Sequence, residues 1–240
     1  MTAIKGILFD YGATLDTNGI HWGRLLWIKY QEIGIPITEE QFREGYVHGE
    51  RTLAHMPLIK PEHTFRDLLD IKVPIEMQYL VDRGYWNPTA EGLSIQASKV
   101  AELCYCYVLS VLDENRKVLQ LCKKIYPLVL VSNFYGNVHA VLTDFRLDSY
   151  FNDIIESVVV GVCKPDPAIW QKGVDALGLS ASEVLVVGDS FTKDIQSAKS
   201  IGCQTAWLKG TGWGNEENDE SLPDYVIGKV SELPKILNIV

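Results

Sequence analysis

The sequence predicts an α/β protein in which a doubly wound parallel sheet carries an inserted helical subdomain. Three observations predict this fold class. Apolar runs of strand length recur in the second half of the chain, and most are continuous rather than alternating, which suits strands buried on both faces of a parallel sheet. Helical patterns separate these runs from about residue 110 onward. Before them, residues 10–126 contain no convincing strand.

The predicted core elements alternate along the chain. The strands are 4–9, 127–132, 153–159, 183–188, 204–208 and 225–228, and the helices are 114–125, 136–146, 166–177 and 191–201. Asp113 is a typical N-cap for the first of these helices. Pro167 falls near the first turn of another, where proline is tolerated, and Gly202 is a plausible stop for the last.

The helical subdomain is predicted from signals that follow the first strand. Helix 23–33 is stopped by Gly34, and "TEEQ" at 38–41 is a capping box that opens a helix to about Met56. A further helix begins within 63–71, and Pro74 should end or kink it. Residues 93–112 form a longer helix. We therefore assign residues 1–16 and 96–240 to the core and residues 17–95 to the helical subdomain.

Composition limits the partners. The 240 residues carry a formal net charge of -9, which disfavours nucleic acid and anionic membranes but allows a small anionic substrate. No apolar run reaches the length of a membrane span. The five cysteines are expected to be reduced thiols in a cytoplasmic protein. The acidic run 215–220 is expected to be a solvated loop. The sequence leaves the oligomeric state open.

Polar residues stand at the carboxyl ends of four predicted strands, and such ends meet at one edge of a parallel sheet, where ligands bind. One of these residues could be a helix cap, but four sets at one edge are difficult to attribute to capping. They are Asp10, then Ser132 and Asn133, then Lys164, and finally Asp189 with Asp194.

Together these side chains suit phosphoryl transfer. Asp10 and Asp189 would repel each other unless a cation lay between them, and carboxylates favour Mg²⁺. The Ser132 hydroxyl and the Lys164 ammonium can donate to phosphate oxygens. An aspartate nucleophile, a metal and an ammonium fit a reaction through an aspartyl-phosphate, in which charge neutralisation supplies most of the rate gain.

Four motifs carry a resemblance to a known family. "FDYGATL", "LVSN", "KPDP" and "VVGDSFTKDI" occur in the order and spacing typical of the haloacid dehalogenase-like hydrolase superfamily, which the chain resembles over residues 1–16 and about 110–235. The resemblance implies a Rossmann-like core, dependence on Mg²⁺ and hydrolysis of small phosphate esters. It also implies that the helical subdomain, 17–95, is a cap that selects the substrate.

The resemblance assigns a role to each matching residue. Asp10 would be the nucleophile and a metal ligand, Gly12 would offer its carbonyl to the metal, and Asp189 would be the second carboxylate ligand. Asp194 would support the metal or orient Lys164. The remaining roles are binding of the phosphoryl group by Ser132 and Lys164, with Asn133 beside them, and bracing of the loop by Thr14.

The sequence departs from the family at Gly12, where the phosphatases carry an aspartate that protonates the leaving group. Loss of such a group typically costs about 10²- to 10⁴-fold in rate. A replacement acid, or a substrate with a good leaving group, would restore turnover. The candidate acids are Asp16, Tyr11 and His21, and His21 is also a candidate substrate contact. For Asp16 and His21 the alternative is a role in a turn and in packing.

Three alternatives compete with a phosphatase, two of them enzymes and one a binding protein. Haloacid dehalogenases resemble this first motif, but they need no metal, and the two carboxylates of "VVGDSFTKDI" argue against that reaction. Phosphonoacetaldehyde hydrolases keep the metal and use a cap lysine, for which Lys29, Lys60 and Lys72 are available. The chain could also be a phosphate-binding relic with little activity. We expect an Mg²⁺-dependent phosphatase of a small phosphorylated metabolite, acting through Asp10.

Overall fold

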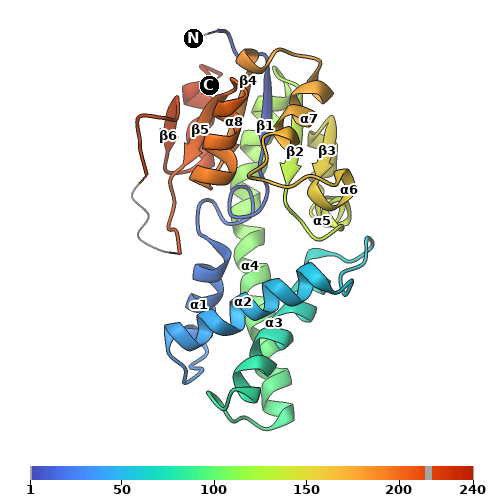
Figure 1. Ribbon diagram of the computed structural model, residues 1–240, viewed down its shortest axis with the longest axis vertical. Helices are drawn as coiled ribbons and strands as arrows, with labels where there is room; N and C mark the ends of the chain where they lie inside the picture. The colour runs from blue at the N-terminus through green and yellow to red at the C-terminus, as the bar shows by residue number, and fades with distance from the viewer. Residues whose placement is uncertain (1, 214–217, 240) are drawn as a thin grey trace.

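The computed structural model describes residues 2–213 and 218–239, and within them the predicted Rossmann-like α/β fold is confirmed (Figure 1). Residues 215–217 of the acidic run lie outside the described residues. The strands form one parallel sheet in the order β3-β2-β1-β4-β5-β6. They are β1 (Gly6–Phe9), β2 (Leu128–Ser132), β3 (Asp153–Glu156), β4 (Val184–Gly188), β5 (Gln204–Leu208) and β6 (Tyr225–Ile227).

Four longer helices follow β1 or lead into β2. They are α1 (Trp22–Glu32), α2 (Glu39–His55), α3 (Phe65–Asp82) and α4 (Ala90–Lys123). Figure 1 shows α1, α2 and α3 gathered on the side of the sheet toward which β1 runs. The expected capping box at the start of α2 is present, because the Thr38 hydroxyl accepts from the Gln41 amide and the Gln41 side chain accepts from the Thr38 amide.

Shorter elements complete the core. The helices are α5 (Val138–Asp144), α6 (Ser157–Val160), α7 (Ala168–Leu177), α8 (Ser197–Ser200) and α9 (Leu233–Ile236). The 3₁₀ turns are η1 (Asp148–Tyr150), η2 (Ala181–Glu183) and η4 (Val230–Glu232), and η3 (Phe191–Gln196) is a π-helical segment. The end of the segment predicted as strand 153–159 is thus helical, in α6.

Both faces of the sheet are covered, which explains the continuous apolar runs. In β1, Ile7 and Phe9 belong to one buried cluster, which includes Leu119 of α4. Leu8, between them, belongs to a second cluster with Trp170 of α7. Successive side chains of a strand point to opposite faces, so a strand with helices on both sides must be apolar at every position.

The predicted helix start at Asp113 is wrong, because α4 continues from Ala90 to Lys123 without a break. Asp113 is exposed in the middle of this helix, and its carboxylate pairs with Arg116 at 2.8 Å, one turn on. The N-cap is Thr89, whose hydroxyl accepts from the Gly92 amide at 3.0 Å. The helix therefore crosses the predicted boundary between residues 95 and 96, and the division into cap and core stays a prediction.

Of the two outcomes expected for Pro74, an end to the helix is excluded, because α3 runs through the proline to Asp82, and the kink stays a prediction. Proline removes one backbone hydrogen bond and crowds the preceding turn. The residues around it are deeply buried, with Val73 and Met77 at 0% exposure. Packing of α3 on α2 and α4 thus outweighs the local preference of the proline.

Helix α4 is long and apolar enough to cross a membrane when judged by length and composition alone. This is weak evidence, because a core helix of a globular domain passes the same test. Val100, Val108 and Leu119 of this helix are buried in the larger hydrophobic cluster. Asn115, also buried, donates a hydrogen bond of 2.8 Å to the carbonyl of Leu15. The helix therefore holds the loop that follows β1.

Candidate active site

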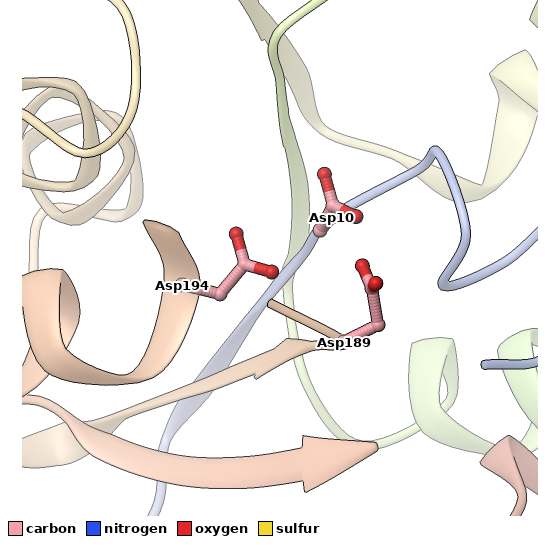
Figure 2. Close-up of side chains that lie close together, drawn as sticks. All are labelled: Asp10, Asp189 and Asp194. Carbon is pink, nitrogen blue, oxygen red and sulfur yellow. The ribbon is translucent and has the colours of Figure 1, made fainter. Parts of the chain in front are cut away.

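Three carboxylates meet at the carboxyl edge of the sheet. Asp10 follows β1 and Asp189 follows β4, and these strands are neighbours. Asp194 comes from η3, which begins two residues after Asp189. One oxygen from each of the three lies within 4.8 Å of the others, and Figure 2 shows the side chains close together. The parallel register therefore brings together residues that are almost 180 positions apart.

The ammonium of Lys164 lies between two of these carboxylates. Its Nζ is 2.5 Å from Oδ1 of Asp10 and 2.9 Å from Oδ1 of Asp194. Burial disfavours the charged ammonium, but Asp10 and Asp194 outweigh that effect and raise the pKa of Lys164 above its usual value. The lysine is therefore a permanent positive charge at neutral pH, suited to holding an anion rather than to donating a proton.

The third carboxylate, Asp189, has no basic partner within 4.0 Å among residues 2–213 and 218–239. Burial, followed by the charges of Asp194 and Asp10, raises its pKa well above the usual range. Burial also raises the pKa of Asp194 to about 6, although Lys164 opposes the shift. Each of these groups would be ionised more readily beside a divalent cation.

This donor set fits Mg²⁺. The ion prefers carboxylate, carbonyl and water oxygens, and Asp10 and Asp189 supply two carboxylates at the mouth of a cavity that Gly12 also lines. Gly188, which ends β4, lets Asp194 approach closely, because a Cβ at that position would overlap the Asp194 carboxylate. The assignment of Asp10, Gly12 and Asp189 as metal ligands stays a prediction.

The loop after β1 is held by its own side chains. The Asp16 carboxylate accepts from the amide of Ala13 at 2.7 Å and from Nε1 of Trp22 at 2.8 Å, so both of its oxygens are occupied. Burial raises the pKa of Asp16 to about 7. Asp16 does not line the cavity, and its contacts are those of a residue that braces the loop. Tyr11 is fully buried and packs against Phe134, with ring centroids 5.7 Å apart.

His21 caps helix α1 and also lines the cavity. Its Nδ1 accepts a hydrogen bond of 3.1 Å from the amide of Gly23. Burial lowers the pKa of His21 to about 4, so the ring is neutral at pH 7. With Nδ1 accepting, the proton is on Nε2. The predicted role as a substrate contact therefore requires donation from Nε2.

Ser132, the last residue of β2, and Asn133, which follows it, have different roles. The Ser132 side chain is 1% exposed, and its hydroxyl has no hydrogen-bond partner within the described part of the chain. Ser132 does not itself line the cavity, although Asn133 does, so the role of this orphaned hydroxyl in holding a phosphoryl group stays a prediction. Asn133 lines the cavity, but its amide is used to position Lys164: it donates to the Lys164 carbonyl at 3.0 Å and accepts from the Lys164 amide at 2.9 Å.

A cavity of about 670 Å³ lies between these groups and the helices α1, α2 and α3. Gly12 lines it, and a Cβ at Gly12 would meet no atom within 4 Å. The position where family phosphatases carry their acid is therefore open space. Of the three lysines proposed for a Schiff base, Lys72 lines the cavity, whereas Lys29 and Lys60 do not.

Lys72 forms part of a network that the sequence did not reveal. It makes an ion pair with Glu50 of α2, and Glu50 accepts a hydrogen bond of 3.0 Å from the hydroxyl of Tyr135, which follows β2. Burial opposes the charge on Lys72, but Glu50 and other neighbours raise its pKa well above the usual value. A Schiff base requires a neutral amine, so this protonated lysine is poorly suited to forming one.

Sequence reasoning also missed an aromatic part of the cavity wall. Tyr46 of α2 and Trp213, which follows β5, stack with ring centroids 5.3 Å apart and an interplanar angle of 20°. Trp213 offered one signal, since it follows a strand at the same edge as Asp10 and Asp189. Tyr46 offered none, because its position over the sheet depends on how the cap helices pack.

Comparison with known proteins supplies the family. A family model described as haloacid dehalogenase-like hydrolase matches residues 4–202. The chain is 28% identical to a glyceraldehyde 3-phosphate phosphatase of Pyrococcus furiosus over 57% of its own length and 56% of that protein. Several matches, including this one, thus span only part of the relative's length. A phosphoglycolate phosphatase of Aliivibrio fischeri is 26% identical over 98% of this chain and 97% of the relative.

Another relative has a different activity. An (S)-2-haloacid dehalogenase of Pseudomonas sp. strain CBS-3 is 30% identical over 99% of this chain and 97% of that protein. Among solved structures, a putative HAD-hydrolase, YfnB of Bacillus subtilis bound to magnesium, matches with a TM-score of 0.59 and 20% identity, covering 99% of this chain and all of that one. At this identity the structural match supports the fold alone.

Proposed function

Because the chain belongs to the haloacid dehalogenase-like hydrolase family, we propose that it is an Mg²⁺-dependent phosphatase of a small phosphorylated metabolite. The observation that carries the proposal is the meeting of Asp10, Lys164 and Asp189 at one cavity. Two relatives named as phosphatases support it, one matching 57% of this chain and the other 98%. We also propose that it acts in the cytoplasm, where its thiols stay reduced.

The reaction proceeds in two displacements at phosphorus. A carboxylate oxygen of Asp10 attacks, an O–P bond forms, and the ester P–O bond breaks with its electron pair on the leaving oxygen. Water then attacks the phosphorus of phospho-Asp10, the bond to the carboxylate breaks, and inorganic phosphate leaves. Lys164 and the Ser132 hydroxyl hold the equatorial oxygens in both steps, and Asn133 keeps the Lys164 backbone in position.

The metal ion would be held by Asp10 and Asp189, with the Gly12 carbonyl and with support from Asp194. When bound, Mg²⁺ neutralises the charge of the phosphate and of the nucleophile. Thr14 orients the nucleophile, because its hydroxyl donates to Oδ2 of Asp10 at 2.8 Å. Asp194 also holds the Lys164 ammonium, at 2.9 Å, and accepts from the amide of Ser190 at 2.9 Å.

The test is release of phosphate from a panel of phosphorylated metabolites with Mg²⁺, by the native chain and by Asp10→Asn. We expect turnover that requires Mg²⁺ and falls at least 10³-fold in the variant, because the nucleophile is gone. Asp175→Asn, at an exposed carboxylate on α7, is the matched control and should keep full activity. Unchanged activity in Asp10→Asn would refute the mechanism, and no turnover of any ester would favour a phosphate-binding relic.

Dehalogenation is the second candidate, favoured by the match of 30% identity over nearly the whole chain to a haloacid dehalogenase. The Asp189 carboxylate beside Asp10 and Asp194 speaks against it, because it has no basic partner among the described residues and would be costly to ionise without a metal ion. Chloride release from 2-chloropropanoate in the presence of a chelator separates the two reactions. A phosphatase releases none, and a dehalogenase needs no metal for it.

A further inference from the structure

The lining of the cavity mixes charged and aromatic residues. The core contributes Asp10, Lys164 and Asp189 together with the rings of Phe134, Tyr135, Phe191 and Trp207, and α2 and α3 contribute the charged Arg43, Glu50 and Lys72. The cap helices and the loop after β5 contribute aromatic rings, which are His21, Trp22, Tyr46, Phe65 and Trp213. A volume of about 670 Å³ is typical of pockets for drug-sized ligands and exceeds what a two- or three-carbon phosphate fills. The aromatic part therefore has room for a larger leaving group.

The aromatic wall is held rigidly. The ring of Trp213 lies directly on the backbone of α1 at Gly23, where a Cβ would overlap the indole. It also stacks on Tyr46, and the guanidinium of Arg43 lies 5.2 Å from its centroid. The His21 ring is 5.7 Å from that of Trp213. Aromatic rings in the lining favour an aromatic ligand over a saturated one of the same size, because aromatic pairs gain from stacked or edge-to-face contact.

Position 12 and the carboxyl groups of Asp16 and Glu50 offer no proton to a leaving group. Gly12 has no side chain, and both oxygens of Asp16 are engaged away from the cavity. Glu50 lines the cavity, and although burial opposes its ionisation, Lys72 outweighs that effect and the pKa of Glu50 lies below its usual value. Glu50 is therefore an ionised acceptor, occupied by Lys72 and Tyr135.

Taking these observations together, we propose that the substrate is an aryl phosphate, with an aromatic ring bonded directly to the ester oxygen and held against Tyr46 and Trp213. The proposal rests on the phosphatase function proposed above. When Asp10 attacks phosphorus, the P–O(aryl) bond breaks and its electron pair stays on the phenolic oxygen, where the ring delocalises it. The aryloxide takes its proton from solvent after it leaves, so the reaction needs no protein acid.

The chemistry of the leaving group explains why such a substrate tolerates glycine at position 12. A phenol such as the tyrosine side chain has a pKa of about 10, whereas that of water, which resembles an alkyl alcohol, is about 15.7. An alkoxide must be protonated as it departs, and a phenoxide need not be. Without an acid, the enzyme should discriminate between the two by about the 10²- to 10⁴-fold that general acids typically contribute.

Three esters test separately the two parts of the proposal, which are binding of an aromatic ring and departure of a good leaving group. Phenyl phosphate has an aromatic ring and a good leaving group, benzyl phosphate has the ring but an alkyl leaving oxygen, and cyclohexyl phosphate has neither. We expect kcat/KM for phenyl phosphate to exceed that for cyclohexyl phosphate by at least about 10²-fold. Benzyl phosphate should turn over as slowly as cyclohexyl phosphate while competing against phenyl phosphate with a lower inhibition constant.

A matched pair of variants tests the aromatic wall. Trp213→Leu should raise KM for phenyl phosphate roughly 3- to 10-fold, the usual range for loss of one aromatic pair, and should leave KM for cyclohexyl phosphate nearly unchanged. Trp213→Phe should recover most of the loss. Trp27→Leu is the control, because Trp27 packs on Phe42 in the same cap but does not line the cavity.

The outcomes separate this proposal from the function on which it rests. Equal or faster turnover of cyclohexyl phosphate, abolished in Asp10→Asn, would overturn the aryl substrate and leave the phosphatase standing. Equal inhibition by benzyl and cyclohexyl phosphates, or an equal effect of Trp213→Leu on both, would also overturn it. Failure to hydrolyse any of the three esters, in a chain that turns over other phosphorylated metabolites, would overturn the aryl substrate alone, and failure on those metabolites as well would remove the phosphatase itself.

Discussion

The hydroxyl of Thr14 donates a hydrogen bond of 2.8 Å to Oδ2 of Asp10. The oxygen of the Thr14 hydroxyl also accepts a bond of 3.1 Å from the backbone amide of Asp189. One fully buried side chain thus links the ends of β1 and β4, and it fixes the proposed nucleophile relative to the proposed second metal ligand. Lys164 donates to the other carboxylate oxygen of Asp10, so both oxygens of this side chain are held in place.

Removal of the Thr14 hydroxyl should therefore impair catalysis more than stability. In Thr14→Val we expect kcat to fall about 10- to 100-fold, because a displaced nucleophile loses its alignment with phosphorus. The free energy of unfolding should fall by only about 1–2 kcal/mol, the cost of one buried hydrogen bond. Steady-state kinetics and urea unfolding measure the two effects. Thr205→Val, in β5 away from the cavity, should lose similar stability and no activity.

Gly188 provides a test of the metal site that leaves all carboxylates in the chain. A Cβ at this position would overlap the Asp194 carboxylate, so Gly188→Ala must displace Asp194 and loosen its hold on Lys164. We expect affinity for Mg²⁺, measured by isothermal titration calorimetry, to fall at least tenfold. Gly92→Ala in α4 is the control. Unaltered Mg²⁺ affinity in Gly188→Ala would argue against a supporting role of Asp194.

Restoration of an acid at position 12 should change which esters react. Gly12→Asp adds a carboxyl group where a Cβ meets no atom within 4 Å, so the fold should accept it. Turnover of cyclohexyl phosphate should rise at least tenfold, while that of phenyl phosphate changes little. Gly12→Asn has the same shape without the acidic proton. If Asn raised turnover as much as Asp, the gain would come from shape, and the missing acid would not be the limitation.

Helix α3 contains a buried carboxyl group that should make stability depend on pH. Glu76 of α3 is 1% exposed, and burial raises its pKa to about 8 despite the nearby ammonium of Lys72. Tyr30 of α1 and Glu50 of α2 also face it. Because the folded pKa lies above the unfolded value of about 4.5, this stabilisation is complete below pH 4.5 and is lost as pH rises to about 8.

Glu76→Gln should remove that dependence, because the amide stays neutral at every pH. Between pH 5 and pH 8 the native chain should lose about 1–4 kcal/mol of unfolding free energy relative to the variant. Chemical denaturation at a series of pH values provides the comparison. Glu40→Gln, at an exposed position of α2, should behave like the native chain. Parallel pH profiles for native and Glu76→Gln chains would show that the carboxyl group is ionised in the folded state.

Local signals in the sequence were reliable where tertiary structure agreed with them. The strands lie where continuous apolar runs predicted them, because burial on both faces demands an apolar residue at each position. The capping box at Thr38 forms as expected. Neither Asp113 nor Pro74 marks a helix end, because each lies in a helix whose buried face continues past it. Packing along a long helix outweighs a single cap or breaker.

The sequence by itself determined which polar side chains gather at the carboxyl edge of the sheet. Asp10, Lys164, Asp189 and Asp194 could be expected to converge because parallel strands end at a common edge, and the structure brings them to one cavity. The sequence also showed that position 12 carries glycine in place of an acid. Only the tertiary structure decided what surrounds them. The positions of Tyr46, Lys72 and Trp213 depend on how the cap helices pack over the sheet, and no periodicity or spacing in the chain encodes a contact between such distant segments.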